Sequence, residues 1–395
     1  MREMKERYVV IRRTSSAAGM PNRIIGATAI ASKSAWLIEA EELKQSQASN
    51  FLTNKDVVCL AKELPMKLIS PVALEECSSS SGNAWGINAI KADSSNFSGS
   101  GVSVAVLDTG LANNHPAFDG IKVTRKDFTG EGDDDGNGHG THCAGIIFGR
   151  DINGGRIGVA PGVTDVYIGK VIGNKSTTTS LIYGIKWAAD QAVDIISMSL
   201  GIDFADIQQY YIDLDYPLPI ASSRAMAAYN ENLKLFERIS TYYGQPGVCS
   251  QSGTIMIAAA GNTSLRKSKK EYYCHTLSPA NAESIIAVSA VQQTSNDFSI
   301  APFSNVYANI SAPGVGILSA YINGPNGSKI LSGTSMAAAH VSGIAALWAQ
   351  KLKGDCMLSR NNLVSKLIAT AVNKSCIDYN YKDYGVGMVQ APQGE

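Results

Sequence analysis

Short apolar runs alternate with longer amphipathic stretches over most of the chain after residue 86. The apolar runs are Val102–Asp108, Asp165–Val171, Asp194–Ser199, Thr254–Ala260 and Ser284–Ala290. Stretches with helical character, such as His139–Phe148 and Ser180–Gln191, lie between them. Uninterrupted apolar strands separated by helices predict an α/β fold, with a mostly parallel central sheet and helices on both of its faces. In such a sheet the functional side chains gather where the strands reach their carboxyl ends.

The first 80 residues have a different pattern. Tyr8–Arg12 and Ala35–Ile38 are predicted strands, Ala40–Leu52 is a predicted helix, and Asp56–Ile69 is a further extended stretch. A run of small and polar residues at 75–84 then has the composition of an exposed linker. We therefore expect a small α+β unit at residues 1–80, a linker to about residue 84, and a larger domain at 85–395.

A long insertion separates two predicted core strands at about residues 202–250. Its second half, Ser222–Tyr243, is a predicted helix with apolar residues at helical spacing. This helix either packs on the core as an ordinary surface helix or forms one wall of a binding cleft. The pattern alone leaves both interpretations open.

Composition narrows the class of protein. Apolar residues make up 45% of the chain, and 34 basic residues balance 34 acidic ones. This balance gives no reason to expect nucleic acid or an anionic membrane as a partner. No apolar run is long enough for a transmembrane helix, and the charged N-terminus lacks the apolar stretch of a secretory signal. As written, the chain is predicted to be cytoplasmic, or secreted if a signal has been trimmed.

The seven cysteines are an odd number, and without a signal peptide they favour free thiols over a disulfide framework. Disulfide bonds between Cys249 and Cys274 and between Cys356 and Cys376 remain the alternative.

Three short motifs carry the candidate chemistry. They are Val106–Gly110 (VLDTG), Gly138–Gly145 (GHGTHCAG) and Ser332–His340 (SGTSMAAAH). In this order they resemble the subtilase family of serine proteases (peptidase family S8), in which the triad follows the chain order Asp, His, Ser. The resemblance runs from about Trp85 to near the C-terminus.

The resemblance implies a catalytic triad of Asp108, His139 and Ser335. A serine hydroxyl needs a base within hydrogen-bond reach, and an imidazole that titrates at about 6.5 suits that task. A buried carboxylate orients the imidazole. By the same resemblance, Asn262 donates its side-chain amide to the oxyanion together with the backbone N–H of Ser335. The implied activity is that of a serine endopeptidase that works through an acyl-enzyme on Ser335, and its chemistry requires no cofactor.

The resemblance also implies a substrate cleft for a protein or peptide. One edge is Ser199, Leu200 and Gly201, and the segment Gly173–Thr177, with Gly173 and Ser176, resembles the opposite edge. An extended substrate would pair between them as an added strand. The wall of the main specificity pocket is expected near Thr276–Ser278. The basic stretch Leu265–Tyr273 beside it is either a solvated loop or a site that favours acidic substrate groups.

Other residues near the motifs are candidates for roles outside the triad. Asp133, Asp135 and Asn137 form an acidic, glycine-rich loop that is a candidate for structural calcium, although it lacks the closing Glu of an EF-hand. The alternative is a set of solvated turn carboxylates. Cys143 is interpreted as a buried thiol behind the catalytic histidine.

The N-terminal unit resembles a subtilase prodomain, which acts as an intramolecular chaperone and inhibitor. We expect the extended segment Pro65–Val72 to lie in the cleft and residues 75–84 to be the region of autoprocessing in a zymogen. The alternative is a permanent accessory domain that is never removed.

One position departs from the family pattern, because Ala339 stands where the serine motif usually has proline. A small shift of Ser335 could alter how well water competes with an amine for the acyl-enzyme. A peptide ligase or cyclase with the same triad is therefore an alternative function. A non-catalytic scaffold is a further alternative, disfavoured because all four catalytic positions are intact.

Overall fold

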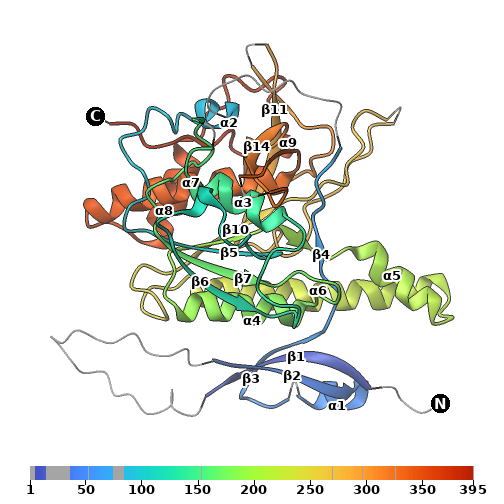
Figure 1. The fold of residues 1–395 in the computed structure, drawn as a ribbon. Coiled ribbons are helices and arrows are strands. Elements are labelled where there is room, and N and C mark those ends of the chain that lie inside the picture. The colour runs from blue at the N-terminus through green and yellow to red at the C-terminus, as the bar shows by residue number, and fades with distance from the viewer. Residues whose placement is uncertain are drawn as a thin grey trace.

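The structure is a computed structural model that describes residues 5–14, 36–51, 53–73, 84–152, 154–268, 270–295, 297–324 and 326–394. The predicted linker at 75–84 falls almost entirely outside the described residues. Within them, eight strands form the central sheet drawn in Figure 1. In spatial order these are β12 (Phe298–Ile300), β11 (Ile286–Gln293), β10 (Ile255–Ala259), β8 (Ile195–Met198), β5 (Ser103–Asp108), β7 (Asp165–Lys170) and β6 (Lys122–Asp127), with β13 (Ile310–Pro313) beside β11.

The neighbouring strands of this sheet run parallel, except that β12 is antiparallel to β11. The five apolar runs of the sequence correspond to β5, β7, β8, β10 and β11. A parallel sheet is packed against other elements on both faces, and the alternating side chains of β5 show which elements pack on each face. Val104 and Val106 belong to the apolar cluster that contains α3 (His139–Phe148) and α7 (Thr334–Gly354). Ala105 and Leu107, which alternate with them, belong to the cluster on the opposite face.

Helices α4 (Thr178–Asp190) and α6 (Leu218–Tyr243) cover that opposite face, below the sheet in Figure 1. The predicted insertion at 202–250 therefore holds the helix that was expected, although α6 begins at Leu218 rather than Ser222. The insertion also contains a helix that the pattern did not predict, α5 (Phe204–Asp213). The smaller elements of the domain are α2 (Trp85–Ala89), the 3₁₀ helix η2 (Pro116–Phe118), β9 (Leu200–Gly201), β14 (Ile317–Ala320), β15 (Ser328–Leu331), α8 (Arg360–Ala369) and α9 (Tyr381–Tyr384).

The N-terminal unit is a three-stranded antiparallel sheet in the order β2–β1–β3, below the helices in Figure 1. Its elements are β1 (Lys5–Arg13), β2 (Trp36–Lys44), α1 (Gln45–Phe51) and β3 (Val57–Lys62). Helix α1 covers one face of this sheet. The other face joins the apolar cluster of α4 and α6, through Val9, Ile11 and Ala61. One apolar core thus continues from the N-terminal unit into the larger domain.

The predicted helix Ala40–Leu52 is wrong in its first part. Residues from Ala40 to Lys44 continue β2 and pair with β1, from Ala40 opposite Val9 to Lys44 opposite Lys5. The sequence at 40–44 has good helix formers, but pairing with a neighbouring strand outweighs this weak local preference. The helix therefore begins only at Gln45.

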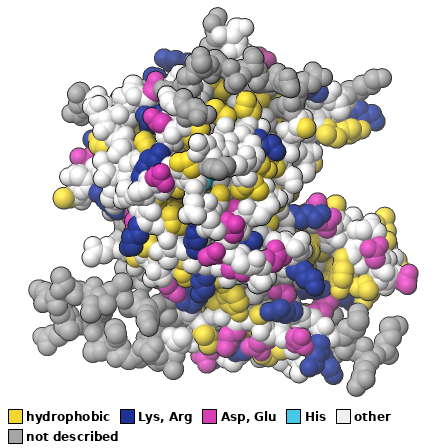
Figure 2. Space-filling view, viewed as in Figure 1, with side chains coloured by type: hydrophobic (Ala, Val, Ile, Leu, Met, Phe, Trp, Pro, Cys, Tyr) yellow, Lys and Arg dark blue, Asp and Glu magenta, His cyan; other side chains and the backbone are white. Residues whose placement is uncertain are grey.

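The surface matches the balanced charge of the chain. On the face drawn in Figure 2, acidic and basic side chains intermingle over the described residues, and no broad patch of one sign covers them. Among the described residues, no helix combines the length and apolar character needed to cross a bilayer. The six cysteines that the structure describes are free thiols, so neither Cys249/Cys274 nor Cys356/Cys376 forms a bridge.

Candidate active site

Asp108 and His139 form a buried pair at the carboxyl edge of the central sheet. Asp108 is the last residue of β5, and His139 is the first residue of α3. Oδ1 of Asp108 lies 2.8 Å from Nδ1 of His139, and both side chains are at most 2% exposed. A carboxylate only accepts hydrogen bonds, so Nδ1 carries the proton, and in the neutral ring Nε2 keeps its lone pair. Nε2 is buried and has no hydrogen-bond partner among the described residues.

The environment of His139 favours its charged form. Burial lowers the pKa of His139, but the charge and hydrogen bond of Asp108 raise it well above the usual value of 6.5. The Cys143 sulfur lies 3.8 Å from Nδ1 of His139. Burial also raises the pKa of the Cys143 thiol, which therefore stays protonated. This agrees with the interpretation of Cys143 as a buried thiol behind the histidine.

Asp135 holds the two elements of this pair together. Its Oδ1 accepts hydrogen bonds from Thr109 Oγ1 at 2.9 Å and from the backbone N–H groups of Asn137 and Gly138 at 3.0 and 2.8 Å. Its Oδ2 accepts from the N–H and the hydroxyl of Thr141. Thr109 follows Asp108, and Thr141 lies in the first turn of α3. The buried carboxylate thus caps α3 and ties it to the end of β5.

The same contacts argue against calcium at the predicted acidic loop. A carboxylate offers about four lone-pair positions, and five protein donors already use those of Asp135. Burial raises the pKa of Asp135, but the hydrogen bonds led by Thr141 outweigh this and lower it overall. Asp133 and Asn137 are exposed. We therefore interpret Asp135 as part of the fold of the site rather than as a calcium ligand.

Ser335 is the second residue of α7 and is fully buried. The unpaired N–H groups and the dipole of a helix N-terminus favour negative charge at this point. In this structure the hydroxyl of Ser335 donates a hydrogen bond to the carbonyl of Ile69 at 3.2 Å.

Asn262 lies on the loop after β10, beside the start of α7. Its Oδ1 accepts hydrogen bonds from the N–H and the hydroxyl of Thr334 at 2.9 and 2.8 Å. The N–H of Thr334 determines which way the amide faces, because a backbone donor can bond only to the amide oxygen. Nδ2 is thereby turned the other way, where it donates to the carbonyl of Ser70 at 2.9 Å. Ile69 and Ser70 are neighbours on one segment of the N-terminal unit.

That segment runs along the predicted substrate cleft. The N–H of Met66 donates to the carbonyl of Ser176 at 2.9 Å. Strand β4 (Lys67–Leu68) pairs antiparallel with β9, and the N–H of Ile69 donates to the carbonyl of Ser199 at 3.2 Å. The segment then passes Ser335, and Val72 donates to the carbonyl of Ser332 at 2.8 Å. The chain therefore crosses the whole site as an added strand.

Most of the predicted cleft residues contact this segment directly. Ser199 and Ser176 bind its backbone, and Leu200 and Gly201 form the strand that pairs with it. Gly173 does not take part in this pairing, because its N–H donates to the hydroxyl of Ser176 at 2.6 Å instead. Its role is to shape the loop that presents Ser176.

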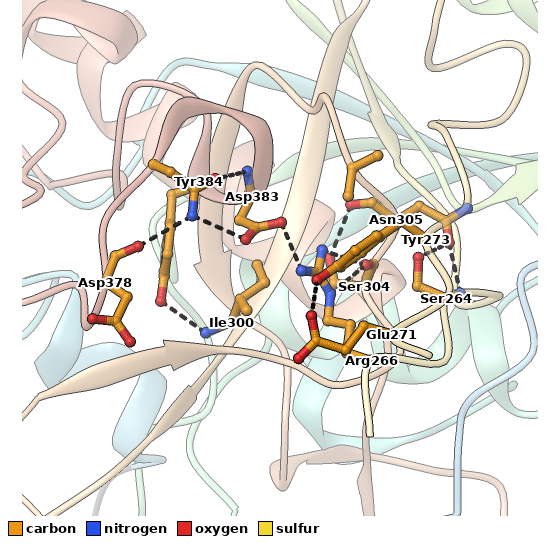
Figure 3. A network of polar contacts seen from close by, with 12 residues as sticks. Ser264, Arg266, Glu271, Tyr273, Ile300, Ser304, Asn305, Asp378, Asp383 and Tyr384 are labelled. Atoms are coloured by element: carbon orange, nitrogen blue, oxygen red, sulfur yellow. Dashed lines mark hydrogen bonds and ion pairs between the residues drawn. The ribbon is translucent and has the colours of Figure 1, made fainter. Parts of the chain in front are cut away.

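The basic stretch beside the predicted pocket wall is held by a network that Figure 3 draws. Arg266, at the start of the basic stretch, pairs with Asp383 at 2.6 Å and donates to the carbonyl of Ser304. Arg266 and Asp383 are at most 14% exposed. The basic stretch is thus anchored to the body of the protein rather than being free in solvent along its whole length.

Asn305, also in Figure 3, organises the loop that carries Asn262. Its Oδ1 accepts from the backbone N–H groups of Thr263 and Ser264 at 3.0 and 3.1 Å. Its Nδ2 donates to the carbonyls of Ala260 and His275. Asn305 is fully buried. It connects the Asn262 loop with the segment that leads into the predicted pocket wall.

Sequence reasoning did not identify the supporting roles of Thr109, Asp135, Thr334 and Asn305. Thr109 and Thr334 stand next to predicted catalytic residues, and a polar residue directly beside Asp108 and Ser335 was the available signal. No comparable signal pointed to Asn305, which lies 43 residues after Asn262 in the chain.

The model of the subtilase family matches residues 99–394. Subtilisin DY of Bacillus licheniformis is 34% identical over 316 residues, which are 77% of this chain and 96% of that protein. The major intracellular serine protease of Bacillus subtilis (strain 168) is 35% identical over 279 residues, or 66% of this chain and 73% of that protein. Subtilisin-like protease 3 of Pseudogymnoascus destructans is 32% identical over 304 residues, or 74% of this chain and 63% of that protein.

Proposed function

This chain belongs to the subtilase family of serine peptidases, and from that premise we propose that it is an endopeptidase with Asp108, His139 and Ser335 as its triad. The observation that carries the proposal is the buried 2.8 Å contact between Asp108 and His139 at the start of α3, a helix that packs against α7, which carries Ser335 in its first turn. The family needs no cofactor for catalysis, and here the chemistry is assigned to side chains alone. Its substrate is a protein or a peptide.

The proposed reaction is acyl transfer through Ser335. Its Oγ attacks the carbonyl carbon of the scissile bond while Nε2 of His139 takes the hydroxyl proton. Asp108 keeps the ring in the required tautomer and stabilises the imidazolium. His139 then gives the proton to the leaving amine, which leaves an ester on Ser335. Water, deprotonated by His139, hydrolyses the ester and regenerates the serine.

Asn262 is proposed to stabilise the tetrahedral intermediates. Its Nδ2, turned into the cleft by Thr334, is aimed at the place where negative charge develops, together with the N–H of Ser335. Because the amide is already oriented before substrate arrives, little reorganisation is needed during the reaction.

We further propose that residues 1–80 are an intramolecular inhibitor and folding aid for the catalytic domain at 85–395. Three contacts support this. The segment from Met66 to Val72 occupies the cleft, Ile69 accepts the hydrogen bond of Ser335, and Ser70 occupies the amide of Asn262. In this arrangement the hydroxyl of Ser335 donates to the carbonyl of Ile69 and not to His139. The amide of Asn262, which is proposed to stabilise the oxyanion, donates to the next carbonyl along the chain, that of Ser70.

The test compares the purified wild type with Ser335→Ala by intact mass and by cleavage of casein and of fluorogenic peptides. We expect the wild type to cleave peptides and to lose about 80 N-terminal residues by processing near the 75–84 linker, and the variant to do neither. Ser342→Ala is the matched control, because Ser342 is a buried serine on the same helix that bonds to Ser197 rather than to the segment.

Each other outcome has a defined meaning. Cleavage by Ser335→Ala would overturn the triad assignment. Activity without any N-terminal loss would overturn autoprocessing and leave the unit as a permanent accessory domain. Transfer of the acyl group to an added amine peptide in preference to water would favour the ligase alternative. An inert wild type that fluorophosphonates do not label, even after limited proteolysis at the linker, would favour the scaffold.

A further inference from the structure

The edge of the substrate cleft leads directly into an acidic helix N-terminus. Strand β9 ends at Gly201, and α5 begins three residues later at Phe204. In the pairing of β4 with β9, Lys67 lies opposite Gly201. The ammonium group of Lys67 forms an ion pair with the carboxylate of Asp206, in the first turn of α5. A side chain of the cleft-bound segment therefore already occupies this position.

The backbone contacts define which substrate residue Lys67 represents. Ile69 donates its N–H to Ser199, and its carbonyl faces the nucleophile Ser335. Ile69 thus stands for the residue directly before the scissile bond, and Lys67 stands for the third residue before it.

From this position we propose that Asp206 forms a subsite that selects substrates with a cationic side chain at the third residue before the scissile bond. The inference rests on the proposed peptidase function and adds a substrate class to it. The insertion that carries α5 supplies the subsite, so it is a property of this chain's own cleft edge.

The alternation of the segment explains why a charged side chain suits this position. Met66 is buried at 5% exposure, whereas the side chain of Lys67 is 57% exposed. Successive side chains of an extended strand point to opposite sides. A substrate residue in the place of Lys67 therefore points away from the floor of the cleft and toward α5. There its side chain is exposed to solvent and lies within reach of the Asp206 carboxylate. Figure 2 shows charged side chains gathered over the region where Figure 1 places α5.

Local structure holds the carboxylate of Asp206 in place. Asp203 caps the helix by accepting the N–H of Ala205 at 2.9 Å, and Asp206 lies within the first turn, where the helix dipole favours a carboxylate. The hydrogen bond to Asp206 and the charges of Asp206 and Asp203 raise the pKa of Lys67. Both acidic residues thus act on the same cation.

The expected preference is modest, because the pair is exposed. Surface ion pairs of this kind correspond to about two- to fivefold in an equilibrium or specificity ratio, and salt screens them. The experiment therefore measures ratios between substrates. The fraction of enzyme that is free of the inhibitory segment is the same for every substrate, so it cancels in such a ratio. A variant that only weakens the binding of Lys67, and so frees more enzyme, therefore cannot be mistaken for one with a changed specificity.

The test uses the full-length protein and three fluorogenic peptides with Met-X-Leu-Ile before the scissile bond, where X is Lys, Gln or Glu. For the wild type at low salt we expect kcat/KM to fall from Lys to Gln to Glu by about two- to fivefold at each step, and the differences to shrink in 0.5 M NaCl. Asp206→Asn should flatten the order, and Asp206→Lys should place Glu above Lys. Asp213→Asn, which removes one exposed charge near the far end of the same helix, should keep the wild-type order.

Equal cleavage of all three peptides by the wild type would overturn the acidic subsite and leave the peptidase function standing. An unchanged preference in Asp206→Lys would overturn the assignment to Asp206. No cleavage of any peptide by the wild type would overturn the proposed function itself, and the inference with it.

Discussion

The hydroxyl of Ser335 lies 3.2 Å from the carbonyl oxygen of Ile69, which precedes it by 266 residues in the chain, and donates a hydrogen bond to it. The next carbonyl, that of Ser70, receives the amide of Asn262. The Ser335 hydroxyl and the Asn262 amide, which are proposed to act on the same carbonyl of a substrate, therefore bind two different, adjacent carbonyls of this segment. Such an arrangement holds the segment in the cleft without matching the geometry of attack.

Displacing the segment should expose the nucleophile. Met66→Asp places a carboxylate at a buried position without a partner, which costs enough free energy to weaken the docking of the segment substantially. We expect the rate of fluorophosphonate labelling of Ser335 to rise on the order of tenfold or more. Lys55→Asp, at an exposed position of the same unit, is the control and should label at the wild-type rate. Equal rates for all three proteins would show that the segment does not restrict access.

Removing the amide donor should affect the chemical step more than binding. Loss of one oxyanion donor in subtilisin lowers kcat by about 10²–10³, and we expect Asn262→Ala to lower kcat by a similar factor with little change in KM. Thr334→Val removes one of the two donors that orient the amide and should cause a smaller loss of the same kind, whereas Thr334→Ser, which keeps the hydroxyl, should restore most of it. Steady-state kinetics on a peptide substrate distinguish these cases. A rise in KM alone would contradict the assigned role.

The pH dependence should reflect the pair of Asp108 and His139. His139 must be neutral to act as a base, and the carboxylate raises its pKa, so kcat/KM should increase with pH through a midpoint above about 6.5. Asp108→Asn should shift this midpoint down and lower kcat by about 10⁴, the cost of the corresponding change in a chymotrypsin-type protease. Asp119→Asn, at an exposed site, should leave the profile unchanged. A midpoint in Asp108→Asn equal to that of the wild type would contradict the electrostatic argument.

Asn305 should matter for both stability and turnover. Asn305→Ala leaves the backbone groups of Thr263 and Ser264 and the carbonyls of Ala260 and His275 without their buried partner. We expect the free energy of unfolding to fall by about 2–4 kcal/mol.

The same substitution should lower kcat more than it changes KM, because the loop that carries Asn262 loses its support. Denaturant unfolding and peptide kinetics measure the two effects. Asn281→Ala removes an exposed amide hydrogen bond to Tyr229 and is the matched control, with an expected change within about 0.5 kcal/mol. A stability loss with unchanged kcat would limit Asn305 to a purely structural role.

Local patterns predicted much of the architecture. The apolar runs became the central strands, and His139–Phe148 is α3 with the same bounds. These features depend on periodicity and on the residues next in sequence. Where a distant partner intervened, the pattern was insufficient. The stretch Ala40–Lys44 became a strand because β1 pairs with it, and Asp135 proved to be a buried cap because Thr109 and Thr141 both reach it.

Contiguous motifs and apolar runs were enough to assign the family, the order of the central strands and the residues proposed for catalysis, because each of these depends on residues that are neighbours in the chain. How the site is occupied became apparent only from the folded chain. It brought Asn262 to Ser70 across 192 residues, and it brought Lys67 of the N-terminal unit to the acidic turn of α5. Such contacts join segments that carry no mutual signal in the chain, and they exist only once the shared apolar core has placed the N-terminal sheet against α4 and α6.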